Sequence, residues 1–168
     1  LVEAGWNGGA GFRALCGGES LPRDLADDVL RRVGTLWNMY GPTETTIWSS
    51  LDRLESGTEP ICIGRPIANT DIYILDRHGE PVPVGVPGEI FIGGEGVAIG
   101  YHARPELTAQ RFVADRLSGR PGARLYAHRD IGPDGKPLPV LLNKRIIVAG
   151  EDMVDARTTV DQNGLPAV

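Results

Sequence analysis

The pattern of apolar residues in the first forty positions predicts a strand, a helix and a second strand. A short apolar run at 12–16 is typical of a buried strand, and Ser20 after it can cap a helix. Apolar residues then recur at helical spacing and would share one face of that helix. They are Leu21, Leu25, Val29, Leu30 and Val33. Gly34 is a helix stop signal, and residues 35–40 have strand composition before Gly41-Pro42. After this bend, Thr43 can cap a short turn.

From Pro60 onward the composition changes to short strands and tight turns. Residues 71–76 and 89–92 are rich in Ile, Tyr, Leu and Phe, and a turn at 77–79 follows the first of them. Pro105 suits the first turn of a helix that we expect to run to Leu117. This part of the chain is therefore predicted to be rich in β-structure.

The sequence pattern after residues 118–122 differs from that of the preceding part of the chain. Residues 118–122 have the composition of a linker, and we expect a domain boundary near 121–126. Two further strands are predicted at 138–142 and 145–148, and a turn at 161–164.

Charge and composition exclude several classes of partner. The chain has 168 residues, a net charge of -5 and a pI of about 5.2, so it lacks the surplus of Lys and Arg that nucleic acids or anionic membranes require. No run approaches the roughly 18 apolar residues of a membrane span. Cys16 and Cys62 have no metal-type spacing and form no disulfide framework, which favours a reducing cytoplasm. Because the chain starts at Leu1 in Gly-rich sequence, we expect it to be part of a longer protein.

One segment carries candidate chemistry. Residues 38–44, Asn-Met-Tyr-Gly-Pro-Thr-Glu, combine an aromatic ring, a rigid bend, a hydroxyl and a carboxylate. A ring can stack on a purine, and a hydroxyl can donate to a phosphate oxygen. A carboxylate beside a phosphate needs a bridging cation, so Glu44 is a candidate Mg²⁺ ligand. Taken alone, the same residues more often form a loop with a turn and a cap than a site.

A family resemblance favours the nucleotide site over the capped turn. Residues 40–48 resemble the signature of the adenylation domains of nonribosomal peptide synthetases, and further stretches match in family order. These are CGGE at 16–19, IGRPIANT at 63–70, GEI at 88–90, GY at 100–101, RPELT at 104–108 and RF at 111–112. The resemblance implies a mixed α/β (α+β) fold. Residues 1–123 would form part of the large N-terminal domain, in its β-rich second half, and the tail would add short extraneous strands.

The resemblance also implies roles for individual residues. Tyr40 would stack on adenine, Asn38 would lie along the adenine edge, and Gly41 would belong to the same nucleotide-binding loop. Thr43 would contact the α-phosphate and Glu44 would bind Mg²⁺, which makes these two the candidate catalytic residues. The amino-acid pocket would be apolar with one bulky ring, suited to a small or apolar substrate. Its expected lining is Ala14, Cys16, Met39, Ile47 and Trp48.

The implied reaction joins ATP and an amino acid to give an aminoacyl-adenylate and pyrophosphate. The aminoacyl group would then pass to the 4′-phosphopantetheine thiol of a peptidyl carrier protein. The family's phosphate loop and catalytic lysine are expected outside this chain, so we expect it to be inactive alone. Tyr126 to Asp130 departs from the family's Tyr-Arg-Thr-Gly-Asp, but Asp130 stands at the offset of the aspartate that holds the ribose.

The tail has a second resemblance. The stretches at 141–148, 150–152, 155–157 and 161–164 are similar to the first periplasmic domain of the protein-export component SecD. We therefore expect a partial adenylation domain at 1–123 and a divergent or chimeric tail at 124–168. A weaker alternative aligns 133–135 and 144–145 with the adenylation-domain hinge. Alternatives for the whole chain are a non-catalytic fusion or remnant with a translocase-like tail, and an acyl-CoA synthetase-type fragment.

Overall fold

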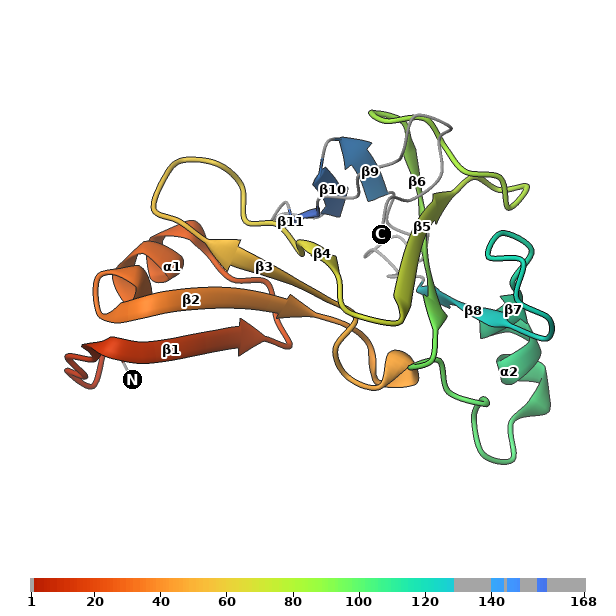
Figure 1. Cartoon of the computed structure of the whole chain (residues 1–168), viewed down its shortest axis with the longest axis horizontal. Helices are drawn as coiled ribbons and strands as arrows, with labels where there is room; N and C mark the ends of the chain where they lie inside the picture. Colours follow the sequence, from red (N-terminus) through yellow and green to blue (C-terminus); the bar gives the residue numbers. More distant parts are fainter. Residues whose placement is uncertain (1, 129–139, 144, 149–153, 157–168) are drawn as a thin grey trace.

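A parallel strand pair with a crossover helix begins the fold (Figure 1). The computed structural model describes residues 2–128, 140–143, 145–148 and 154–156. β1 (Gly9–Gly17) and β2 (Val33–Tyr40) are parallel, and α1 (Arg23–Leu30) connects them. Parallel strands need such a crossover, and its apolar side packs back on the sheet. The buried cluster that joins them consists of Ala26, Val33, Leu36, Leu54 and Ile61.

The helix is shorter at both ends than the sequence pattern predicted. Its N-cap is Pro22, with no side-chain cap hydrogen bond, so the prediction of Ser20 as the cap was wrong. At the other end, Gly34 lies inside β2. A Cβ atom at Gly34 would be 2.1 Å from the carbonyl oxygen of Ala10, so the glycine permits close approach of two strands and does not stop a helix.

Two antiparallel strands complete the first sheet, whose order is β1-β2-β3-β4. β3 (Ser50–Leu54) pairs with β2, and β4 (Arg65–Pro66) pairs with β3. Between β2 and β3 the chain makes a short 3₁₀ turn, η1 (Thr43–Thr45), where the sequence predicted a turn.

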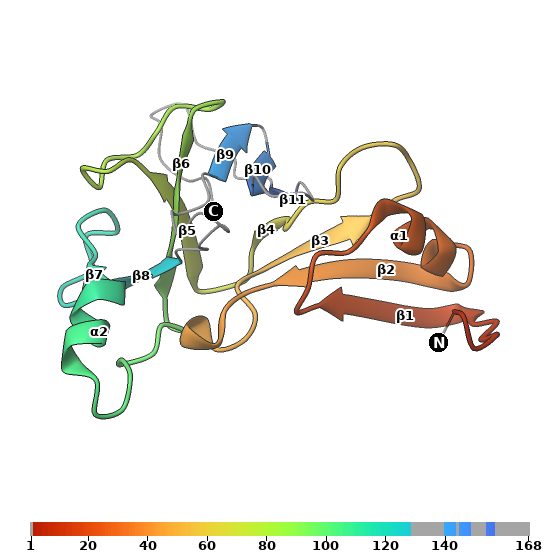
Figure 2. The same ribbon diagram turned by 180° about the vertical axis from the view of Figure 1, so that it is seen from behind.

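The strand pairs of the second sheet are antiparallel, and the sheet crosses the direction of the first (Figures 1 and 2). Its strands are β5 (Thr70–Leu75), β6 (Pro87–Gly94), β7 (Phe112–Ala114), β8 (Arg124–His128), β9 (Val140–Asn143), β10 (Arg145–Val148) and β11 (Val154–Ala156). β6 is central, since it pairs with β5, β8 and β9. The strands at 71–76, 89–92, 138–142 and 145–148 were thus correctly predicted, to within a few residues at their ends.

Both faces of the second sheet are covered by apolar side chains, because successive residues of a strand point to opposite faces. On one face the buried residues are Ile63, Ile72, Ile74, Ile90 and Ile92. On the other they are Tyr73, Leu75, Phe91, Leu125 and Ala127. This double burial explains why the strands read as nearly continuous apolar runs.

The second helix also ends earlier than predicted. α2 (Pro105–Arg111) stops where Phe112, which is 3% exposed, enters β7 and pairs with Tyr126 of β8. The linker-like residues 118–122 form the β7–β8 connection, where Arg120 makes an ion pair with Asp71 of β5. β8 therefore packs with the residues that precede it. No helix within the described residues is long and apolar enough to cross a membrane.

Candidate functional site

The signature residues form a tight loop where the two sheets meet (Figure 1). The backbone amide of Thr45 donates to the Pro42 carbonyl at 3.1 Å, and that of Thr46 donates to the Thr43 carbonyl at 3.2 Å. Thr46 and Ile47 have φ values of 61° and 71°, which non-glycine residues rarely adopt. Such backbone strain is concentrated at functional sites. The loop leaves Thr43 exposed.

A second segment, residues 95–101 after β6, packs directly on this loop. The amide of Ala98 donates to the Glu44 carbonyl at 2.8 Å, and Thr46 Oγ1 donates to the Gly96 carbonyl at 2.7 Å. A Cβ atom at Gly96 would be 2.9 Å from the Thr45 carbonyl oxygen, so only glycine fits without a shift. The two segments therefore position each other.

The Glu44 carboxylate is held from the second sheet. Tyr101 Oη donates to Glu44 Oε1 at 2.5 Å, and Tyr126 lies within hydrogen-bonding reach of the same carboxylate. Partial burial acts to raise the pKa of Glu44, but the hydrogen bonds from Tyr101, its own backbone and Tyr126, with the charge of His128, outweigh it and lower that pKa. Burial and the neighbouring carboxylate raise the pKa values of both phenols. At neutral pH the site thus holds one carboxylate and two neutral hydroxyls.

Tyr40 lies at the end of β2 with its ring partly buried. The ring packs against the isoleucine cluster of the second sheet and makes an edge contact with the His128 ring, with centroids 5.6 Å apart. His128 in turn lies 6.1 Å from the Tyr126 ring. Tyr40, Glu44, Tyr126 and His128 are thereby gathered in one place.

The other residues that were predicted to bind the nucleotide are Asn38, Gly41 and Asp130. Asn38 is 5% exposed, and its Nδ2 donates to the Cys62 carbonyl at 2.7 Å, so its amide already has a partner within the fold. Gly41 faces crowded backbone, since a Cβ atom there would be 2.6 Å from the Ser49 amide nitrogen. Asp130 lies outside the described residues.

The five predicted pocket residues do not share one surface. Ala14 and Cys16 pack against the cluster beneath α1. Met39 is on the opposite face, because successive β2 residues alternate and Asn38 is paired with Cys16. The residues of β1 on the Met39 face include Arg13, Leu15 and Gly17, of which Gly17 pairs with Met39.

Trp48 belongs to that second face. A Cβ atom at Gly17 would be 2.6 Å from the Trp48 ring, while Ile47 beside it is 58% exposed. Leu15, which is 67% exposed, lies on the same face of β1 as Gly17. The pocket of Ala14, Cys16, Met39, Ile47 and Trp48 stays a prediction.

Glu44 is the residue of this site that could hold a magnesium ion of a bound nucleotide. Among the described residues, no group of three or more His, Cys, Asp and Glu side chains could hold a metal. Glu44 is one ionised carboxylate with an exposed threonine beside it. Mg²⁺ is commonly bound by one or two carboxylates together with substrate phosphates and water. The donor set is consistent with that arrangement.

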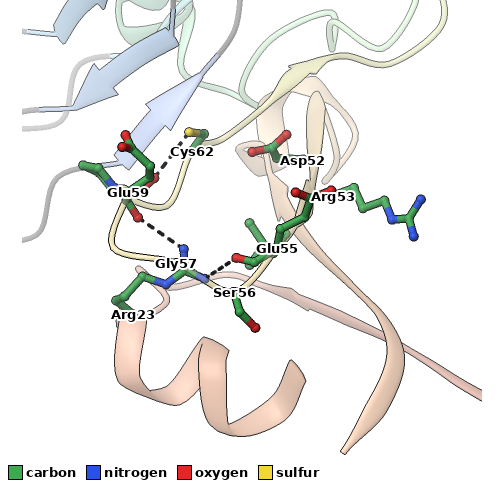
Figure 3. Close-up of a pocket in the computed structure, with 10 residues that line it drawn as sticks. Arg23, Asp52, Arg53, Glu55, Ser56, Gly57, Glu59 and Cys62 are labelled. Carbon is green, nitrogen blue, oxygen red and sulfur yellow. Dashed lines mark hydrogen bonds between the residues drawn. The ribbon is translucent and has the colours of Figure 1, made fainter. Parts of the chain in front are cut away.

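A separate pocket of about 240 Å³ lies between the start of α1 and the chain after β3 (Figure 3). Arg23 spans it, with Nη1 donating to the Glu59 carbonyl at 3.2 Å and Nη2 to the Glu55 carbonyl at 3.0 Å. Arg23 also pairs with Asp27 at 3.2 Å. Since its guanidinium is committed to backbone carbonyls, this arginine joins a loop to a helix and is not displayed for a ligand.

Comparison with known proteins agrees with the signature. Residues 8–102 match the model of the family described as AMP-binding enzyme. The chain belongs to the AMP-binding enzyme family. The match includes the Tyr40–Glu44 loop and reaches Tyr101.

The similar proteins are peptide synthetases. The chain is 50% identical over 121 residues to a dimodular nonribosomal peptide synthase of Bacillus subtilis (strain 168), and the match covers 71% of this chain and 5% of that protein. It is 46% identical over 120 residues to tyrocidine synthase 2 of Brevibacillus parabrevis, covering 70% of this chain and 3% of that protein. The chain thus spans a small part of these relatives.

A solved structure gives the fold. The crystal structure of a four-domain holo nonribosomal peptide synthetase bound to AMP and glycine superposes with a TM-score of 0.75 at 40% identity, over 99% of this chain and 12% of that one. The predicted fold class is confirmed: the chain is a mixed α/β, β-rich piece of an adenylation domain of the peptide synthetase type. These comparisons give no support to the SecD-like interpretation of the tail.

Proposed function

We propose that this AMP-binding chain contributes one wall of an ATP and amino-acid site in an amino-acid-activating adenylation domain. The observation that carries the proposal is the Glu44 carboxylate, kept ionised in a strained loop beside Tyr40 and an exposed Thr43. The similar peptide synthetase that was solved with AMP and glycine supports the ligand class.

The reaction joins the substrate carboxylate to the α-phosphorus of ATP. A carboxylate oxygen forms the new bond to phosphorus, and the bond from phosphorus to the pyrophosphate oxygen breaks. In this assignment the Tyr40 ring stacks on adenine, and the Thr43 hydroxyl donates to an α-phosphate oxygen. Glu44 would hold Mg²⁺, which when bound offsets the negative charge of the phosphates. Catalysis of this kind is mainly orientation and charge stabilisation.

The substrate side chain would lie on the Met39 face of the first sheet. Leu15, Gly17 and Met39 share this face, with the Trp48 ring against Gly17 and Ile47 next to it. These side chains are apolar, and the tryptophan ring fills space above the glycine. We therefore propose a small or apolar amino acid as the substrate. Transfer to the 4′-phosphopantetheine thiol of a peptidyl carrier protein would follow in the whole enzyme.

The domain boundary that the sequence predicted near residue 123 should be moved toward the C-terminus. Leu125, Tyr126 and Ala127 are all at most 5% exposed, and they belong to a strand between β6 and β7. β9 then pairs with β6 at Pro87 and Gly88. We propose that the boundary between the adenylation-domain part and the divergent tail lies after His128 and not near residue 123.

Nucleotide binding by the full chain tests the proposal. Stacking on an aromatic ring contributes about 1–3 kcal/mol, so Tyr40→Ala should weaken AMP binding roughly 5- to 150-fold by calorimetry. Tyr40→Phe is the matched control, because it keeps the ring and should bind AMP within about twofold of wild type. An unchanged dissociation constant for a folded Tyr40→Ala variant would falsify the assignment.

A further inference from the structure

Glu44 is connected to the second sheet by the Tyr101 hydroxyl, across 57 residues of sequence. Tyr101 is itself firmly placed. Its backbone amide donates to Thr108 Oγ1 at 2.9 Å, and its ring makes an edge contact with the Phe112 ring, with centroids 5.5 Å apart. Phe112 is 3% exposed. The phenol that reaches Glu44 is therefore fixed at its backbone and at its ring.

Tyr126 packs beside Tyr101 from β8. Its ring lies 5.3 Å from that of Phe112, against which the Tyr101 ring also packs. Phe112 and Tyr126 therefore fix the aromatic surroundings of Tyr101, which donates the hydrogen bond to Glu44 Oε1.

The Tyr101 hydrogen bond leaves the Glu44 carboxylate with further acceptor positions. An ionised carboxylate offers about four acceptor positions, and the Tyr101 hydroxyl occupies one of them. A donor on one oxygen fixes the plane of the carboxylate and so the direction of its remaining lone pairs. Partners of this kind, bonded to a metal ligand and not to the metal, commonly change metal affinity by about 10- to 100-fold.

We propose that Tyr101 is the positioning residue for Glu44, and that it orients the carboxylate to receive the divalent cation of a bound nucleotide. The proposal rests on the proposed function, because it takes Glu44 to be the magnesium ligand. It adds that cation binding by the loop after β2 depends on a side chain of the segment that follows β6. The affinity for a nucleotide without its metal should not depend on the Tyr101 hydroxyl.

The test measures ATP binding by the full 168-residue chain, by calorimetry, once with EDTA and once with saturating Mg²⁺. The ratio of the two dissociation constants is the magnesium gain. Glu44→Gln should abolish this gain. Tyr101→Phe keeps the ring and should reduce the gain by about 10-fold or more, while the affinity in EDTA stays within about twofold of wild type.

Tyr73→Phe is the matched control, since Tyr73 is a buried phenol of β5 that packs in the other face's cluster. It should leave both affinities unchanged. If Glu44→Gln loses the magnesium gain and Tyr101→Phe keeps it, the positioning role is overturned and the proposed function stands. If Tyr101→Phe weakens binding equally with and without Mg²⁺, its role is only structural, and the proposal also fails. A full magnesium gain in Glu44→Gln would overturn the metal assignment itself.

Discussion

Gly17 of β1 and the indole ring of Trp48 are in direct contact. A Cβ atom at Gly17 would lie 2.6 Å from the Trp48 ring and 2.5 Å from the Met39 carbonyl oxygen. Only a hydrogen atom fits between the strand and the ring. This contact determines how far the aromatic side chain can extend over the face that we assign to the substrate.

Gly17→Ala should therefore destabilise the fold. The backbone oxygen of Met39 cannot move without disturbing the β1–β2 register, so overpacking should cost about 1–3 kcal/mol. The measurement is urea unfolding followed by tryptophan fluorescence. Gly11→Ala is the control in the same strand, because a Cβ atom there meets nothing within 4 Å and its change should stay below about 0.5 kcal/mol. Equal stability of the two variants would contradict the contact.

Asn38→Ala should also reduce the free energy of unfolding. The variant leaves the Cys62 carbonyl without its 2.7 Å donor in a buried position, which costs about 1–3 kcal/mol. The exposed Asn7 is the control, and Asn7→Ala should change stability by less than about 0.5 kcal/mol. If Asn38→Ala also weakens AMP binding after correction for folding, its amide serves both the fold and the nucleotide. A change in stability alone would assign it to the fold.

Local sequence patterns were sufficient to predict most strands. They failed where a contact between residues far apart in the sequence determines the end of an element. The runs at 71–76 and 89–92 are apolar on both faces, and they form β5 and β6. The helix predicted to reach Leu117 ends at Arg111, because Phe112 gains more from burial between Tyr101 and Tyr126 than from another helical turn. That partner strand lies twelve residues further on, so helical spacing alone could not reveal it.

The same limit applies to the site. The family signature pointed to Tyr40, Thr43 and Glu44; Tyr40 ends β2, and Thr43 and Glu44 lie in the η1 turn that follows it. The partners of Glu44 could not be found from the motif, because Tyr101 and Tyr126 become neighbours only after the second sheet forms. The pocket prediction with Ala14 and Cys16 stays a prediction. The parallel pairing with β2 places these two residues on the face opposite Met39, and this strand register could not be found from the motif.

Arg23 should stabilise the chain between β3 and β4. Its two bonds to the Glu55 and Glu59 carbonyls are charge-assisted, and such bonds contribute about 1.5–3 kcal/mol. Arg23→Met should lose about that much stability and accelerate amide exchange at 55–59. Arg53→Met is the control, since Arg53 lines the same pocket but points away from it (Figure 3). Similar exchange rates in both variants would contradict this role of Arg23.

Tyr73 should make the fold sensitive to alkali. Burial, together with the charges of Asp71 and Asp115, raises the pKa of Tyr73 to about 12 from 10.0, and Arg120 offsets part of this shift. A group whose pKa is higher in the folded state stabilises the fold fully below its unfolded pKa, and this contribution is lost as pH rises through the folded pKa. Between pH 10 and 12 the unfolded chain loses a proton that the folded chain retains, so the free energy of unfolding should fall by about 1.4 kcal/mol per pH unit because of this residue.

The Tyr73→Phe variant tests this, because it lacks the hydroxyl that titrates. The difference in urea unfolding free energy between wild type and Tyr73→Phe should therefore be constant from pH 7 to 9 and should shift toward the variant between pH 10 and 12. A difference that does not change with pH would show that the Tyr73 hydroxyl has an ordinary pKa.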